Sequence, residues 1–255
     1  MTTAARRERI LELLRASGYM SIEDLVAQFR VTAQTLRADV NRLADEGRLV
    51  RHHGGASMAS SVVNTSYALR RTEFAREKAL IAQTLAQWLP DRCSLFLSLG
   101  TTMLAVAQAL GARKALKVIT NHLEAAQTLV AQADTEVILL GGHLQRRNLG
   151  VSGTGTLAAV EQYRADLCLF SVGGIDPEGN LLDYHEAEVD IVRAMLRRAR
   201  QRVLVVDHSK FGRTASVRIG SITEVSAIAT DKPLAPALKK LLRGHAVEVL
   251  ASGAR

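Results

Sequence analysis

Residues 18–56 carry the pattern that most limits what this chain can fold into: two short helices at a tight turn, then a strand, a glycine turn and a return strand. Ser21 and Thr32 are good N-cap residues, and Asp24, three positions after Ser21, completes a capping-box pattern. We therefore expect a helix to begin after each of them, with the turn at residues 29–31. This layout is typical of a winged helix-turn-helix, which places its second helix in the DNA major groove.

The second of these helices has two distinct faces. Leu36, Val40 and Leu43 recur at helical spacing and form one apolar stripe. We expect that stripe to pack on apolar residues of the preceding helices, namely Ile10, Leu13, Leu14, Leu25 and Phe29. The opposite face carries Gln34, Arg37, Ala38 and Asn41. Gln and Asn bond to adenine, Arg bonds to guanine or phosphate, and Ala allows contact with a thymine methyl, so we expect this face to meet base edges.

A basic stretch, Arg48 to Gly55, follows this helix and predicts a wing for phosphate or minor-groove contact. The alternative is that helices with polar outer faces are common and that an outward Gln or Asn is usually only solvated. Two capped helices followed by a basic wing favour the DNA-binding interpretation. The residues predicted to contact DNA are Thr32, Gln34, Thr35, Arg37, Ala38, Asn41, Arg42, Arg51, His52 and His53.

Residues 6–56 resemble the winged helix-turn-helix domain of the DeoR family of bacterial repressors. The recognition helix of that family commonly reads Thr-x-Arg-Arg-Asp-Leu, and this chain has Thr35-Leu36-Arg37-Ala38-Asp39-Val40. The resemblance implies that the partner is double-stranded operator DNA, bound in the major groove. Ala38 stands where the family has its second arginine, near the centre of the outward face, so the family's operator preference does not carry over.

Length and composition limit the remainder of the chain. The sequence has 255 residues, of which about 180 lie beyond the wing, enough for a well-buried α/β domain. It contains no apolar run of about 18 residues and no signal-like segment, so we expect a cytoplasmic protein with no membrane partner. The only cysteines, Cys93 and Cys168, lie singly, so we expect no metal site.

The charge of the chain is weak evidence for a DNA partner. The formal net charge is +8, but residues 1–60 hold nine arginines, no lysine and seven acidic residues, a net charge of only +2. A few arginines placed on phosphates fix the register of a protein on DNA, whereas overall charge merely attracts. The positions of Arg37, Arg42, Arg48 and Arg51 therefore count for more than the total.

Beyond the wing the pattern alternates between short apolar runs and helical segments. We expect strands at 95–99, 117–120, 136–140, 166–172, 202–206, 225–229 and 247–250. We expect helices at 73–88, 101–110, 124–131, 155–163 and 185–200. This order predicts a mostly parallel sheet covered on both faces, in which ligands bind at the carboxyl ends of the strands. The expected domains are a winged helix-turn-helix at 1–57, a linker at 58–74 and an α/β domain at 75–255.

Several strand ends carry residues suited to a small polar anion. At Gly100-Thr101-Thr102 a strand ends in glycine and a helix begins, so free N–H groups and the helix dipole predict a phosphate site, although such a junction also serves as a plain helix cap. Lys210 would supply charge to the phosphate, and Asp183 or Glu186 would accept hydrogen bonds from hydroxyls or simply cap the next helix. The other predicted ligand-binding residues are Thr120, Asn121, Gly141 and Gly142, of which the two glycines are equally consistent with a turn.

These segments resemble the sensor domain of DeoR-type regulators, which is related in fold to ribose-5-phosphate isomerase and coenzyme A transferases. The resemblance implies that the domain binds a phosphorylated sugar or polyol as an effector without turning it over, with no catalytic residue and no cofactor. The strings Arg51–Ala56, Val63–Thr65, Asp183–Glu186 and Val206–Arg213 are similar to family members that respond to sn-glycerol 3-phosphate, which implies that effector. A reading head that matches two half-sites implies a homodimer or homotetramer.

Two alternatives remain at this stage. The chain is also consistent with a regulator of another sugar-phosphate pathway that has the same architecture. The second alternative is a sugar-phosphate isomerase, in which Lys210 and a nearby carboxylate would move a proton at a carbon beside a carbonyl. No second acid-base pair is visible in the sequence, and an attached DNA-reading module favours control over turnover.

Overall fold

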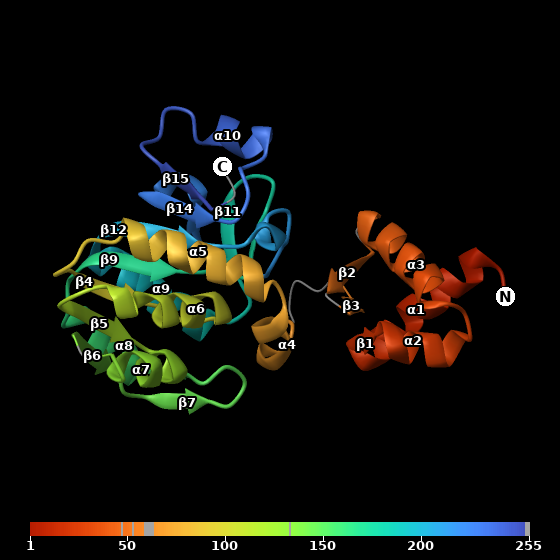
Figure 1. Ribbon diagram of the computed structural model, residues 1–255, viewed down its shortest axis with the longest axis horizontal. Helices are drawn as coiled ribbons and strands as arrows, with labels where there is room; N and C mark the ends of the chain where they lie inside the picture. The colour runs from red at the N-terminus through yellow and green to blue at the C-terminus, as the bar shows by residue number, and fades with distance from the viewer. Residues whose placement is uncertain (47, 53, 59–63, 133, 253–255) are drawn as a thin grey trace. The chain divides into compact units, whose positions relative to one another are not determined.

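The computed structural model describes residues 1–255 except 47, 53, 59–63, 133 and 253–255 (Figure 1). The chain divides into two compact units, Met1–Ser61 and Val62–Arg255. No helix in the described part of the chain is long and apolar enough to span a membrane. Because the first unit carries the predicted winged helix-turn-helix, we call it the DNA-reading unit, and we call the second the sensor unit.

The DNA-reading unit contains the two predicted capped helices. Its elements are α1 (Thr3–Ser17), β1 (Tyr19–Ser21), α2 (Ile22–Phe29), α3 (Ala33–Asp45), β2 (Leu49–His52) and β3 (Gly55–Met58). Ser21 Oγ accepts from the Asp24 N–H at 3.0 Å and Asp24 completes the capping box, while Thr32 Oγ1 accepts from the Thr35 N–H at 3.2 Å. Both predicted helix starts are confirmed. Between the helices Arg30 takes the left-handed conformation, with φ 53°.

The wing is confirmed as the antiparallel hairpin β2–β3, and it gains a third strand that we did not predict. The strand order is β1-β3-β2, because Tyr19–Ser21 pairs with Gly55–Ser57. A Cβ atom on Gly55 would lie 2.4 Å from the Met20 carbonyl oxygen, so this close pairing requires glycine. A three-residue strand that runs directly into a helix cap shows no alternation, which explains why it escaped prediction.

The core of the DNA-reading unit follows the predicted stripe with one correction. Leu36, Val40 and Leu43 are buried together against α1 and α2. In α1, Leu11 is buried along with Ile10 and Leu14, whereas Leu13, which we expected in the core, is only half-buried. Both leucines lie near Ile10 and Leu14 on the helix, so spacing alone did not decide between them.

The sensor unit is built on the predicted parallel sheet. Its seven strands are β4 (Ser94–Leu97), β5 (Leu116–Thr120), β6 (Thr135–Leu139), β9 (Ala165–Phe170), β12 (Ala199–Val205), β14 (Ala227–Thr230) and β15 (Glu248–Ala251). The order is β15-β14-β12-β9-β4-β5-β6, and neighbouring strands pair in parallel. Such a sheet is buried on both faces, which is why its strands are short, nearly continuous apolar runs.

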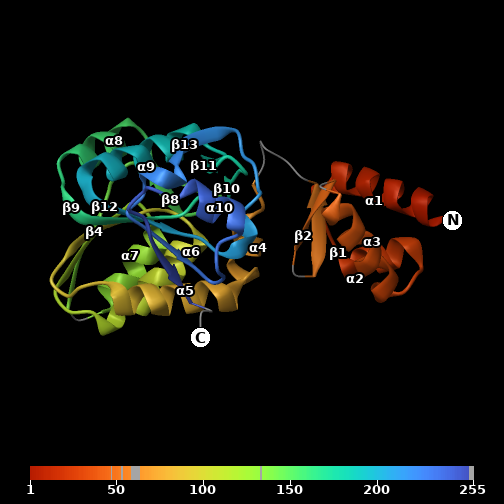
Figure 2. The same ribbon diagram turned by 90° about the horizontal axis from the view of Figure 1, so that it is seen from above.

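Helices cover both faces of this sheet, as predicted (Figure 2). One face packs against α5 (Ala75–Trp88), α6 (Thr101–Ala109) and α7 (Leu123–Val130), and the other against α8 (Thr154–Glu161), α9 (Glu186–Arg198) and α10 (Pro236–Leu241). Unpredicted are α10, the hairpin β7–β8 (His143–Gln145, Gly150–Ser152) and the antiparallel sheet of β10 (Gly174–Ile175), β11 (Asn180–Asp183) and β13 (Val217–Ser221). These elements are short and lie among turn residues, so they give little periodic signal.

Part of the segment that we expected to be a linker is folded. Helix α4 (Tyr67–Thr72) lies within it and belongs to the sensor unit, whereas residues 59–63 lie outside the described residues. The Tyr67 hydroxyl donates to Glu124 Oε2 at 2.5 Å, and Arg71 Nη1 lies 2.9 Å from Glu124 Oε1. The small, polar composition of this stretch concealed contacts that depend on residues far along the chain.

Candidate functional site

The outward face of α3 is open to solvent. Gln34, Arg37, Ala38 and Asn41 are all exposed, on the side of the helix opposite the buried stripe. Arg51 of the wing donates from Nη1 to Asn41 Oδ1 at 2.9 Å, which ties the wing to the helix. The structure therefore brings the predicted base-reading residues together on one accessible surface.

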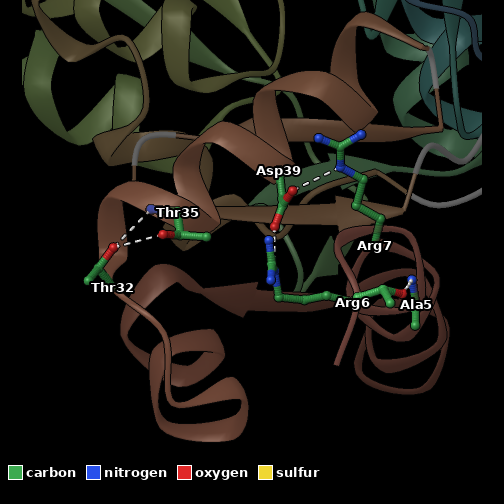
Figure 3. Close-up of polar contacts among 7 residues, drawn as sticks. Ala5, Arg6, Arg7, Thr32, Thr35 and Asp39 are labelled. Atoms are coloured by element: carbon green, nitrogen blue, oxygen red, sulfur yellow. Dashed lines mark hydrogen bonds and ion pairs between the residues drawn. The ribbon is translucent and has the colours of Figure 1, made fainter.

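Other predicted DNA-contacting residues take different positions. His52 is buried, its Nε2 lies 2.7 Å from Ser57 Oγ, and its ring packs edge-on against Tyr19 at 5.7 Å. It therefore belongs to the interior of the wing and does not face solvent as we expected. Thr32 and Thr35 are engaged in capping α3 (Figure 3), and exposed Arg42 pairs with Glu46 at 2.7 Å. His53 lies outside the described residues.

Sequence reasoning missed a buried carboxylate on α3. Asp39 is 2% exposed and accepts from Arg6 Nε at 2.6 Å and from Arg7 Nε at 2.8 Å (Figure 3). These contacts tie the start of α1 to the middle of the recognition helix. An acidic residue on the apolar side of an amphipathic helix, between Leu36 and Leu43, was the signal that could have revealed it.

The sensor unit has a polar pocket near the carboxyl ends of its central strands. Of the residues predicted to bind an effector, Gly100, Thr101, Thr102, Asn121, Asp183 and Lys210 line it. The pocket is further lined by residues that we did not predict to bind an effector, among them Asn64, Thr65, Ser66, Tyr67, Arg70, Arg147, Asn148 and Glu188. Six of the predicted residues therefore line the pocket, and part of the remainder comes from the segment that we treated as a linker.

The pocket presents donors suited to an anion. Helix α6 begins after Gly100, whose φ is 128°, and no side chain of the described residues caps it. The first N–H groups of an uncapped helix are unpaired and carry the positive end of its dipole. Lys210 is buried and lines the same pocket, and no described residue forms an ion pair with its ammonium group. Arg70 lies on the opposing segment, its Nε donating to the Thr65 carbonyl oxygen at 3.0 Å.

Burial shifts the ionisation of these groups. Burial, together with the nearby Arg213 guanidinium and against the opposing charge of Asp207, lowers the pKa of Lys210 to about 8. Burial likewise lowers the pKa of Arg70 and raises the pKa of Asp183. Each group is thus less stable in its charged form than it would be in water. A dianion held between Lys210 and Arg70 would offset that cost for these two cations.

Four of the predicted effector-binding residues do not line the pocket. The Thr120 hydroxyl is buried and donates to the Leu97 carbonyl oxygen at 2.7 Å. Gly141 and Gly142 make a turn against α8, where a Cβ atom on Gly142 would lie 2.1 Å from Thr156 Oγ1. Glu186 is exposed at the start of α9, and Glu188, two residues on, faces the pocket in its place.

Glu188 is neutralised within the pocket wall. It forms an ion pair with Arg147, and Asn148 Nδ2 donates to its Oε1 at 3.0 Å. The charges of Glu188 and Arg147 therefore offset each other. Among the charged residues that line the pocket, Lys210 and Arg70 then remain against the carboxylate of Asp183. Buried Asp207, outside the lining, also acts on Lys210. The lining itself therefore favours a negatively charged occupant.

Comparison with known protein families agrees with this two-part organisation. The DeoR-like helix-turn-helix domain matches residues 6–62, and the DeoR C terminal sensor domain matches residues 73–232. The chain belongs to the DeoR family. Its DNA-reading and sensor units thus correspond to the two domains that define the family.

Individual relatives match over nearly the whole length. The glycerol-3-phosphate regulon repressor of Escherichia coli is 41% identical over 98% of this chain and 99% of its own. The HTH-type transcriptional repressor CsqR of the same organism is 37% identical over 98% of this chain and 96% of its own. Among solved structures, ribose 5-phosphate isomerase from Methanocaldococcus jannaschii matches 54% of this chain and 55% of its own at 15% identity, with a TM-score of 0.41, too low to transfer a ligand or an activity.

The departure from the DeoR motif at Ala38 allows a direct test of the reading face. Ala38→Arg restores the family's pattern on an exposed position of α3, so we expect altered operator choice or affinity, by about 1–3 kcal/mol at a base that the arginine contacts. Binding would be measured across a library of operator sequences. Ala79→Arg, at an exposed position of α5, adds the same charge as a control. Unchanged binding across the library would show that residue 38 does not face the bases.

Proposed function

We propose that this DeoR-family chain is a transcriptional repressor that binds operator DNA and releases it when its sensor unit binds sn-glycerol 3-phosphate. The observation that carries the proposal is the pocket itself, where an uncapped helix start, Lys210 and Arg70 present positive charge to one small space. The E. coli relative named glycerol-3-phosphate regulon repressor supports the choice of effector, because it matches this chain from end to end.

In this proposal the DNA is read by α3. Gln34, Arg37, Ala38 and Asn41 meet base edges, because they lie exposed opposite the buried stripe of a helix that can enter the major groove. Arg42 and Arg51 contact phosphates at either side of that face, and these contacts set the register of the protein on the duplex. His52 is excluded from the contact set because its side chain is buried.

The effector is held by its two chemically different ends. The phosphate accepts from the N–H groups at Gly100–Thr102, from Lys210 and from Arg70. The glycerol hydroxyls meet Asn121 and Asp183. Asn121 Nδ2 donates to the Val151 carbonyl oxygen at 2.9 Å, while its buried Oδ1 has no partner among the described residues and is free to accept from a hydroxyl.

Repression and release then follow from coupled equilibria. Two chains associate so that paired reading heads match two half-sites one helical turn apart or a multiple of it. Effector binding favours an arrangement of the assembly that fits those half-sites less well. Since an isomerase would also bind a sugar phosphate, we further propose that the pocket binds its ligand without turnover, in keeping with relatives named as repressors. The site of action is the cytoplasm, where the operator DNA is.

A gel-shift assay tests this function. Operator DNA would be titrated with the protein in the presence of sn-glycerol 3-phosphate and, in parallel, other sugar and polyol phosphates, with ligand integrity followed afterwards. We expect sn-glycerol 3-phosphate to release the DNA unconsumed. By reciprocity, operator DNA should weaken ligand affinity by the same factor by which the ligand weakens operator affinity. Equal ligand affinity with and without operator would rule out the scheme, release by another phosphate would reassign the effector, and turnover at an enzymatic rate would favour the isomerase.

A further inference from the structure

Helix α4, which carries pocket-lining residues and is the sensor helix closest in sequence to the DNA-reading unit, has no buried residue. Helix α4 begins at Tyr67, six residues after Ser61, the last residue of that unit. It has six residues. A helix this short is not stable alone, so its place depends on contacts that other elements make with it. Helix α4 in turn holds the two residues that lead into it, because Arg70 Nε donates to the Thr65 carbonyl oxygen and Ser66 Oγ accepts from the Leu69 N–H.

One carboxylate contacts two side chains of α4. Glu124, in the first turn of α7, accepts from the Tyr67 hydroxyl through Oε2 at 2.5 Å and pairs with Arg71 through Oε1 at 2.9 Å. The side chain of Glu124 is 18% exposed and that of Arg71 is 51% exposed, so the carboxylate is partly shielded from water and the guanidinium is not. Buried His122 adds a third contact, with Nε2 at 3.3 Å from the Tyr67 hydroxyl. We call Tyr67, Arg71 and Glu124 the α4 latch.

The latch is connected to the pocket through Tyr67. The guanidinium of Arg70 lies over the Tyr67 ring, 5.6 Å from its centre, and Arg70 itself lines the pocket. Lys78 Nζ contacts the Arg70 carbonyl oxygen and lies 3.1 Å from Thr101 Oγ1, which is also in the pocket. One face of Tyr67 thus meets a residue that can bond the effector, and its hydroxyl meets the residue that anchors α4.

We propose that Glu124 is a positioning residue that fixes α4 on the sensor fold, so that effector occupancy passes through the α4 latch to the DNA-reading unit. This rests on the proposed function. A ligand shifts a conformational equilibrium only through contacts that differ between the two states, and an anion bonded to Arg70 makes such contacts with the segment that carries α4. Without the latch, α4 no longer moves together with the pocket residues when the ligand binds. Ligand binding then no longer weakens operator binding.

Two conservative variants and one control test the latch in the full-length protein. Glu124→Gln keeps the size of the side chain and removes its charge, and Tyr67→Phe removes only the hydroxyl. Glu136→Gln makes the same change as the first at an exposed ion pair, with Lys117 Nζ 3.0 Å from Glu136 Oε1, outside the pocket lining. Three quantities are measured for each: exchange of the Arg70 and Glu73 amides, affinity for sn-glycerol 3-phosphate, and operator affinity with and without that ligand.

We expect the two latch variants to exchange the α4 amides about tenfold faster than wild type, because each loses a hydrogen bond to a charged group. We expect Glu124→Gln to keep its affinity for sn-glycerol 3-phosphate within about twofold of wild type. The factor by which the ligand weakens operator binding should fall by about fivefold or more. Glu136→Gln should match wild type in all three. Unchanged exchange, or faster exchange with an unchanged coupling factor, would overturn the proposal. If none of the phosphorylated ligands causes the wild-type protein to release operator DNA, the proposed function fails. The exchange measurement still decides whether Glu124 holds α4.

Discussion

Replacing Lys210 by methionine is expected to abolish the response to effector and leave the operator occupied. Lys210 is buried in the pocket beside the uncapped start of α6, and its ammonium group forms no ion pair with the described residues. A hydrogen bond to a charged group contributes about 1.5–3 kcal/mol, so removing it should weaken sn-glycerol 3-phosphate binding about 10- to 150-fold. Calorimetry would measure the affinity, and a gel shift at fixed ligand would show DNA that stays bound.

The pH dependence gives this prediction an independent readout. Burial lowers the pKa of Lys210 to about 8, whereas a phosphate monoester is already close to a dianion at pH 7. Affinity should therefore fall as the pH rises through about 8, because only the protonated lysine attracts the anion. Lys210→Arg should remove that fall, since arginine keeps its charge. Lys240→Met, at an exposed position of α10, serves as the matched control. Wild-type affinity in Lys210→Met would show that the phosphate binds elsewhere.

The parts of this fold that the sequence predicted are those with a local or a repetitive signal. The starts of α2 and α3 depend on Ser21 and Thr32, whose capping partners lie three residues away. The strands of the sensor sheet are continuous apolar runs because both faces are buried, and the rule that ligands bind at strand ends then located Gly100, Asn121 and Lys210. These inferences required no knowledge of which distant residues meet.

The parts that escaped prediction depend on contacts between residues far apart in the chain. Tyr67 meets Glu124 across 57 positions, and contacts of this kind make a small, polar stretch into a pocket wall. Glu186 and Glu188 were nearly equivalent in sequence, and the start of α9 decided which of them faces the pocket. His52 looked like a cation on a basic wing, but its side chain is buried and contacts Ser57 on the neighbouring strand.

Asp39→Asn is expected to destabilise the DNA-reading unit more than any other single change of charge in it. Asp39 is 2% exposed and receives Nε donors from both Arg6 and Arg7, whose side chains are 12% and 30% exposed (Figure 3). Removing one partner of a buried charge pair costs about 3–5 kcal/mol, because the remaining charge is left uncompensated. Arg7 can turn toward water, so we expect a loss near the lower end, about 3 kcal/mol.

The loss should appear as faster amide exchange across α1 and α3 and as weaker operator binding, with the sensor unit unchanged in its affinity for sn-glycerol 3-phosphate. Asp45→Asn makes the same substitution at an exposed position of the same helix and should leave both quantities unchanged. The triple variant in which Arg6 and Arg7 are also replaced by methionine should recover much of the stability, because it leaves no buried charge without a partner. If Asp39→Asn exchanges like Asp45→Asn, the ion pairs do not hold α1 to the recognition helix. If the triple variant is no more stable than Asp39→Asn, the loss arises from packing and not from uncompensated charge.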